Sequence, residues 1–470
     1  MSREGKLVKN TIILAIGTFF PKFAIFITLP VLTAYLSKVD YGTYDLIQTL
    51  IALVLPAATL QIHSAAFRYL IDVPHDEKGK TSIISNIFGF VIPTSLAALA
   101  IMFFLLGGQS LVLRLAICAY FLFDILVNAN RQIIRGLGRN VDYAFSSFIS
   151  AAGQILLTYV LLVGTNSGLL GAVIALAVTE MIASLYLLFK GKIYRYIDIK
   201  SLNGGVLKEL LGYSWPMVPN SLSQWVMRAA DRAIITGFMG AAHNAIYAVA
   251  TKIPSILTFA QTTFNMAWQE NASIVSKDKD VADYYSRMFR VLFDIVSGGM
   301  SVLIGLTPIL FALLVNGDYD AAYNHMPIQF MATFALCMST FWGGIFVAYK
   351  ETKAVGLTTV ISAAIHLAIV LSGIWFFGIY AASVASLVSY VALCVLRLLG
   401  VKKLVTIEYP WKHVAVVLAV LTAQCVMCFF RNWALDAVNL VLGAVVCVAL
   451  NLPMLKGILA KLTKRLKKRA

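Results

Sequence analysis

Charge is scarce in this chain of 470 residues: Asp, Glu, Lys and Arg together make up only 13% of it. Hydrophobic residues make up 60%, and the mean hydropathy is +0.83. This composition excludes a soluble globular domain and predicts a polytopic membrane protein. The apolar runs are continuous rather than alternating, which excludes a closed β-barrel.

Cysteine is also rare, and its pattern indicates no redox or metal centre. The six cysteines lie in apolar stretches, and the CxxC pair Cys425 and Cys428 has no histidine or second pair beside it. Buried small apolar side chains are the better interpretation, so we expect no cofactor. We also expect no cleavable signal peptide, because Arg3, Lys6 and Lys9 precede an apolar run far longer than a signal segment.

Long apolar runs are what the chain has in abundance. Runs long enough to cross a bilayer as a helix recur fourteen times, which predicts an all-α fold of about 14 transmembrane helices. The predicted spans are 11–35, 44–66, 82–106, 111–128, 142–163, 168–189, 211–237, 243–266, 288–315, 326–348, 355–377, 379–398, 412–430 and 434–454.

The net charge of +16 is explained by membrane topology rather than by nucleic acid, which we exclude as a partner. With the N-terminus inside, the termini and the even-numbered connections hold 31 of the 38 Lys and Arg residues, and the outer connections hold only Lys38 and Arg431. Positive charge concentrates on the cytoplasmic side of membrane proteins. The sequence therefore predicts an even number of spans with both termini in the cytoplasm.

The chain carries an internal repeat of six spans. Three pairs of similar segments recur in the same order at separations of 203–214 residues: Tyr41–Tyr44 with Asn244–Tyr247, Arg135–Arg139 with Tyr349–Lys353, and Gly168–Ala175 with Gly378–Ala385. An even-numbered repeat keeps both copies in one orientation, so two lobes should enclose a site near mid-membrane. We predict lobes at residues 1–200 and 201–405, followed by two extra helices and a basic tail at 406–470.

Four cations lie inside apolar spans, where a charge costs about 2.5–3.5 kcal/mol at the bilayer centre. They are Lys22, Arg228, Arg232 and Lys252. The seventh span places Asn220, Gln224, Arg228, Asp231 and Arg232 on one helical face. Such residues usually face a protein interior or a water-filled path. We therefore predict a central cationic cavity for an anionic ligand, lined by Lys22, Arg228, Arg232, Lys252, Gln224 and Asp231.

Structural roles compete with this hypothesis. Arg228 and Asp231 could neutralise each other across one helical turn, although Arg232 would then still lack a partner. Lys252 could form a structural ion pair. Asp124, Glu180 and Asp294 are candidates for a coupling ion, Na⁺ or H⁺, but pairing between helices is the default interpretation for them.

At these positions the chain resembles the polysaccharide flippases of the multidrug/oligosaccharidyl-lipid/polysaccharide exporter superfamily. The residues that carry the resemblance are Tyr41-Gly-Thr-Tyr44, Arg135-Gly-Leu-Gly-Arg-Asn140, Gly168-Leu-Leu-Gly-Ala172, Asp231-Arg232-Ala-Ile-Ile235 and Ala245–Ile253. The similarity extends over essentially the whole chain.

The resemblance implies a flippase in the bacterial inner membrane that moves an undecaprenyl-pyrophosphate-linked oligosaccharide to the outer leaflet by alternating access. Lys22, Arg228, Arg232 and Lys252 would contact the pyrophosphate and acidic sugars, for which the planar fork of arginine is suited. Membrane lipids and polysaccharide biosynthesis enzymes are further candidate partners, and no enzymatic activity is implied.

Three other functions compete with this one. A cation-coupled multidrug antiporter of the same superfamily would have an acidic site and usually twelve spans. A flippase for the lipid-linked peptidoglycan precursor would carry an Arg-Asp pair in its first span, where this chain has Lys22 followed by Phe23. A polysaccharide polymerase or ligase would need a large outer loop, but the largest here is about ten residues long, around Asn316–Asp320.

Overall fold

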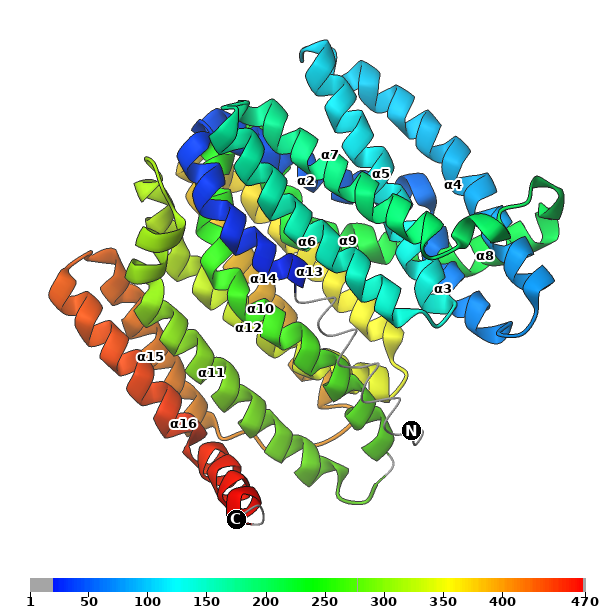
Figure 1. Ribbon diagram of the computed structural model, residues 1–470. Helices are drawn as coiled ribbons and strands as arrows, with labels where there is room; N and C mark the ends of the chain where they lie inside the picture. Colours follow the sequence, from blue (N-terminus) through cyan, green and yellow to red (C-terminus); the bar gives the residue numbers. More distant parts are fainter. Residues whose placement is uncertain (1–19, 277, 468–470) are drawn as a thin grey trace. The chain divides into compact units, whose positions relative to one another are not determined.

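The computed structural model describes residues 20–276 and 278–467, and all regular elements in these ranges are helical (Figure 1). The prediction of an all-α polytopic membrane protein is confirmed. The chain divides into two compact units, Met1–Ala245 and Ile246–Ala470.

The first unit contains the helix Phe20–Tyr35 and the elements α2 to α9. Their bounds are α2 Lys38–Thr59, α3 Ile62–Asp72, α4 Glu77–Leu105, α5 Leu111–Gly136, α6 Asn140–Tyr159, the π-helical turn η1 Val160–Gly164, α7 Gly168–Phe189, the 3₁₀ turns η2 Ile193–Tyr196 and η3 Ile199–Ser201, α8 Gly204–Ser214 and α9 Met217–Met239.

The long helix α10, Ala241–Val275, begins in the first unit and continues into the second. The second unit then contains α11 Val281–Leu314, α12 Asp320–Ala348, α13 Thr352–Phe377, α14 Ile379–Val401, α15 Trp411–Phe429 and α16 Trp433–Lys467.

Helices occupy all fourteen predicted spans, as far as these lie within the described residues. Ten of these helices are long and apolar enough to cross a membrane, or 11 if the bent pair α2 and α3 is one span. Only part of the first span is described, since residues 1–19 lie outside the described ranges. The helices α9 and α10 occupy the seventh and eighth predicted spans; α9 carries the polar face described above, and α10 carries Lys252.

The second span is broken. Leu60 and Gln61 both have left-handed backbone conformations, with φ of 45° and 57°, and the axes of α2 and α3 differ by 56°. A residue in this conformation ends a helix because the intrahelical hydrogen bonds cannot continue through it. Pro56 lies inside α2, so the sharp bend follows the proline by one turn rather than coinciding with it.

Gly42 allows a close approach of α2 to the first residues of α10. A Cβ atom at position 42 would lie 1.7 Å from the carbonyl oxygen of Ala241. Across the same contact, Asn244 Nδ2 donates a hydrogen bond to the carbonyl oxygen of Gly42 at 2.8 Å. The motif Tyr41-Gly-Thr-Tyr44 therefore has a packing role in the first unit.

The last two helices are packed on α11. A Cβ atom at Gly305 would lie 2.7 Å from the backbone of Asn439 on α16, so the two helix backbones lie close together. Ser301 Oγ donates to Gln424 Oε1 on α15 at 2.6 Å, and Asn439 Nδ2 donates to the carbonyl oxygen of Gln424 at 3.1 Å. This buried polar network holds α15 and α16 against α11.

Two arginines at or just beyond the predicted ends of apolar spans, Arg131 and Arg397, are bonded inside helices. The helix α5 continues to Gly136, eight residues past the predicted end of its span, and it therefore includes Arg131. Arg397 is buried in α14, where its Nη1 donates to the carbonyl oxygen of Ser339 at 3.0 Å. Apolar run length underestimates a helix whose last turns carry internally bonded arginines.

Candidate functional site

The polar face of α9 is held against α2 by a buried ion pair. Arg232 Nε lies 2.8 Å from Asp45 Oδ2, and the two side chains keep only 19% and 7% of their surface exposed. Paired charges can be accommodated in an apolar surrounding because each one replaces part of the hydration that the other has lost. The expectation that Arg232 would lack a partner was therefore wrong.

Two further contacts fix the rotation of α9. Trp225 Nε1 donates to the carbonyl oxygen of Thr49 on α2 at 2.8 Å. Gln61 Nε2, at the break between α2 and α3, donates to Ser221 Oγ at 2.9 Å. Since Ser221, Trp225 and Arg232 recur at intervals of four and seven residues, they form one stripe that faces α2.

Arg228 falls on the same stripe by its spacing, three residues after Trp225, but its side chain is exposed. Among the described residues it forms no ion pair. It is close enough to Lys22, on the helix Phe20–Tyr35, for the two cations to repel each other. The structure thus brings together two of the predicted site residues, from the first and seventh spans, within one unit.

The remaining predicted site residues occupy different environments. Gln224 is half-buried on α9, one turn before Arg228, whereas Asp231 is buried with 2% of its surface exposed. Lys252 is half-buried on α10 and belongs to the second unit, two residues before Pro254 in the same helix.

The sequence analysis gave no role to Asp45, the partner of Arg232. The acidic side chain was visible in the second span, but no local spacing links it to a residue 187 positions later in the chain. Within the described residues there is also no group of three or more His, Cys, Asp or Glu side chains that could hold a metal ion.

Lys22 and Arg228 offer a defined chemistry. Both side chains have hydrogen-bond donors and no acceptor, and the guanidinium group can give two parallel hydrogen bonds to a phosphate or carboxylate. The two cations repel each other, and an anion bound near them would relieve that repulsion. The arrangement therefore suits an anionic ligand.

Comparison with known proteins gives the same broad assignment. The sequence model of a family described as polysaccharide biosynthesis protein matches residues 7–269, more than half of the chain. No curated protein matches the sequence.

Several solved structures share the fold. The lipid II flippase MurJ in an inward closed conformation has a TM-score of 0.68 at 15% identity, covering 95% of this chain and 100% of its own. An inward-facing multidrug resistance MATE family transporter of the MOP superfamily has a TM-score of 0.67 at 12% identity, covering 83% and 98%. A MOP superfamily transporter from Pyrococcus furiosus, described as having a binding pocket of reverse polarity, has a TM-score of 0.58 at 14% identity, covering 84% and 95%.

Proposed function

Because the chain belongs to the polysaccharide biosynthesis protein family, we propose that it is a flippase for undecaprenyl-pyrophosphate-linked oligosaccharides. It moves them from the inner to the outer leaflet of the bacterial cytoplasmic membrane. The observation that carries this proposal is the pair of neighbouring cations Lys22 and Arg228 on otherwise apolar helices.

The pyrophosphate of such a lipid is the chemical group that best fits these two cations. It carries several oxygen acceptors and negative charge, so it can accept the fork of Arg228 and the ammonium group of Lys22 at once. The polyprenyl chain can stay in the bilayer because the cations need to contact only the polar head.

We assign secondary roles to the other predicted residues. Arg232 is neutralised by Asp45, so its first effect is to fix α9 in the orientation that exposes Arg228. Gln224, one turn from Arg228, is placed to give a further hydrogen bond to the head group. Lys252 and Asp231 complete the proposed set of substrate-binding residues.

The proposal includes the membrane topology and the transport cycle. Both termini lie in the cytoplasm, where the enzymes that assemble the lipid-linked oligosaccharide are candidate partners. Transport occurs by alternating access, in which the polar head group is taken up on the cytoplasmic side and released outside.

A cation-coupled multidrug antiporter is the second candidate, supported by the MATE transporters among the structures of similar fold. A cationic drug requires an available carboxylate. Asp45 is already paired with Arg232, and Lys22 and Arg228 would repel such a drug. A lipid II flippase, as MurJ is described, is the third candidate, and Lys22 followed by Phe23 in place of an Arg-Asp pair argues against it.

Transport by the purified, full-length protein in liposomes tests the proposal. The probe is an undecaprenyl-pyrophosphate oligosaccharide with a fluorescent sugar, and its exposure on the outer leaflet is followed by a membrane-impermeant quencher. We expect Arg228→Ala and Lys22→Ala to reduce the rate at least tenfold. Their matched controls are Arg195→Ala and Lys200→Ala, at exposed residues in the connection after α7, which should transport normally.

The outcomes separate the candidates. Equal transport rates for the wild type, Arg228→Ala and Lys22→Ala would contradict the proposal that these two residues bind the anionic substrate. Efflux of a cationic dye that depends on the protein but ignores Lys22 and Arg228 would favour the antiporter. Transport of lipid II in preference to the oligosaccharide probe would favour the peptidoglycan precursor.

A further inference from the structure

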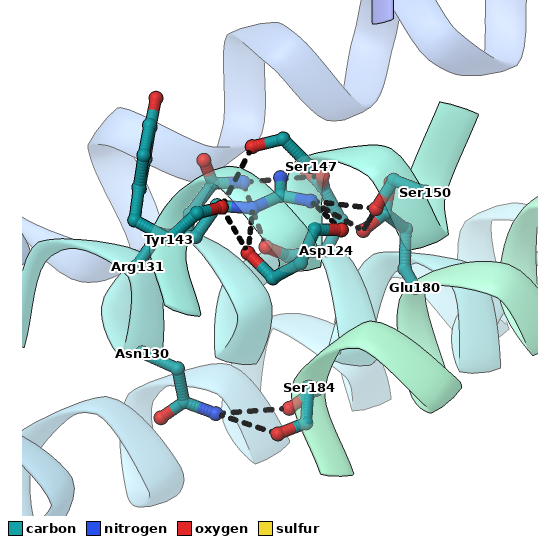
Figure 2. A network of polar contacts seen from close by, with 10 residues as sticks. Asp124, Asn130, Arg131, Tyr143, Ser147, Ser150, Glu180 and Ser184 are labelled. Atoms are coloured by element: carbon teal, nitrogen blue, oxygen red, sulfur yellow. Dashed lines mark hydrogen bonds and ion pairs between the residues drawn. The ribbon is translucent and has the colours of Figure 1, made fainter. Parts of the chain in front are cut away.

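A second polar cluster, formed by residues of α5, α6 and α7, lies inside the first unit (Figure 2). Glu180 on α7 lies 3.6 Å from Arg131 Nη2 on α5. Ser150 on α6 connects them, since its Oγ donates to Glu180 Oε2 at 2.9 Å and accepts from Arg131 Nη2 at 2.5 Å. Asp124, two turns before Arg131 on the same face of α5, interacts electrostatically with both charged residues.

The charges of this cluster do not balance. Asp124 and Glu180 together bring two negative charges, and Arg131 brings one positive charge. Asp124 and Glu180 lie near the middle of α5 and α7, both of which are long and apolar enough to cross the membrane. A net charge at this depth is unfavourable, so uptake of one positive charge stabilises the cluster.

The hydrogen bonds indicate which carboxylate takes up that charge. Glu180 has the guanidinium group of Arg131 and the hydroxyl of Ser150 to stabilise its ionised form. The side chain of Asp124 accepts one hydrogen bond, from the neutral amide of Asn128 at 3.1 Å. The positive charge that the cluster takes up is therefore bound by the carboxylate of Asp124.

The fold itself does not require these carboxylates. By the internal repeat, α5, α6 and α7 correspond to α12, α13 and α14, and these three helices contain no Asp or Glu after Asp320 at the first position of α12. At the end of α5, Arg135 and its counterpart Tyr349 are 214 residues apart, and at that offset the counterparts of Asp124 and Arg131 are Met338 and Ile345. Gly168 and Gly378, at the start of α7 and just before α14, are 210 residues apart, which makes Tyr390 the counterpart of Glu180. All three counterparts are buried, so α12, α13 and α14 pack together without these carboxylates.

A path of polar groups leads from the cluster to α9. Tyr120, one turn before Asp124, interacts electrostatically with Asp124, Glu180 and Tyr44 on α2. Tyr44 accepts a hydrogen bond from Gln154 at 3.4 Å and directly precedes Asp45, the partner of Arg232. The groups that act on Asp124 are Glu180, Arg131 and the amide of Asn128, all on α5 or α7, and α6 contributes the hydroxyl of Ser150 to the cluster.

We propose that Asp124, with Glu180 and Arg131, forms a proton-binding site that couples proton uptake to binding of the anionic substrate. This rests on the proposed flippase function. The ion is a proton rather than Na⁺ because Arg131 occupies the side of Glu180 and repels a metal cation, whereas a proton bonds to a single carboxylate oxygen. Protonation removes one negative charge from the unit that carries Lys22 and Arg228. Lower pH should therefore strengthen anion binding.

A first experiment needs no substrate. Infrared spectra of the full-length protein in phosphatidylglycerol vesicles are recorded against pH, and the carbonyl stretch of a protonated carboxylic acid is followed. We expect a titrating band in the wild type that is absent in Asp124→Asn. In Glu180→Gln the band should move to lower pH, because Asp124 then has Arg131 to itself; this variant still tests the proposal if Asp124→Asn does not fold. The matched control is Asp283→Asn, at an exposed carboxylate on α11.

A second experiment measures the coupling, with undecaprenyl pyrophosphate as the probe. Its affinity for the wild type should fall about fivefold or more as the site loses its proton, the size of a typical coupling between two sites. In Asp124→Asn the affinity should not change with pH.

Each result bears on the proposal. A band that titrates identically in the wild type and in Asp124→Asn overturns it, as does a pH-independent affinity in the wild type. If the carbonyl band does not change with pH but the spectrum changes with the Na⁺ concentration, the cluster binds sodium and the proton proposal is wrong. If the band behaves as expected but the probe does not bind, the proton site stands and the flippase function fails.

Discussion

The buried ion pair between Asp45 and Arg232 gives a quantitative prediction about how α9 is held. Asp45→Asn and Arg232→Gln each leave one charge without its partner in a mostly buried site. Removal of one member of a buried pair destabilises a protein by about 3–5 kcal/mol. Arg232 keeps 19% of its side-chain surface exposed, so we expect the lower end of this range, about 3 kcal/mol for each variant.

The double variant separates the pair interaction from other effects. When both charges are removed, neither is left uncompensated, so the total loss should be well below the sum of the two single losses. We expect a coupling free energy of about 2–3 kcal/mol, near the upper end of values for residues in direct contact. The free energy of unfolding is measured for all four proteins in the same detergent by steric trapping. Additive losses would refute the interpretation that Arg232 acts mainly through Asp45.

Two further predictions concern packing. Gly42→Ala should lower the free energy of unfolding by about 1–3 kcal/mol, because the new Cβ would lie 1.7 Å from the Ala241 carbonyl oxygen. The control Gly237→Ala on α9, where no atom lies within 4 Å of the new Cβ, should not destabilise the protein. Equal shifts of the thermal melting temperature in the two variants would contradict this reasoning. Gln424→Leu should cost about 1–3 kcal/mol by removing the acceptor of Ser301, and faster proteolysis of α15 and α16 than in the wild type is the measurement.

Run length and hydropathy predicted the helices well because the bilayer imposes both. The least apolar spans were also found, since the polar residues of α9 and α10 are flanked by long apolar stretches. The break at Leu60 and Gln61 could not be predicted, because neither residue favours a left-handed conformation and the neighbouring Pro56 indicates a different position.

The candidate site was predictable only in part. The spacing of Gln224, Arg228 and Arg232 on one helix, and the unusual charge at Lys22, were sufficient to select these residues. The sequence could not distinguish Arg228, which is exposed, from Arg232, which is paired with Asp45. That difference depends on which helix packs against α9, and contacts between residues distant in the sequence leave no local pattern.

Binding of undecaprenyl pyrophosphate to the purified, full-length protein tests the central claim most directly. The comparison is with undecaprenol, which has the same chain without the phosphates. We predict clear preference for the pyrophosphate, and a loss of about 10- to 100-fold in Arg228→Ala, because hydrogen bonds to charged groups contribute about 1.5–3 kcal/mol. Equal affinity for both lipids, or unchanged affinity in Arg228→Ala, would contradict the account.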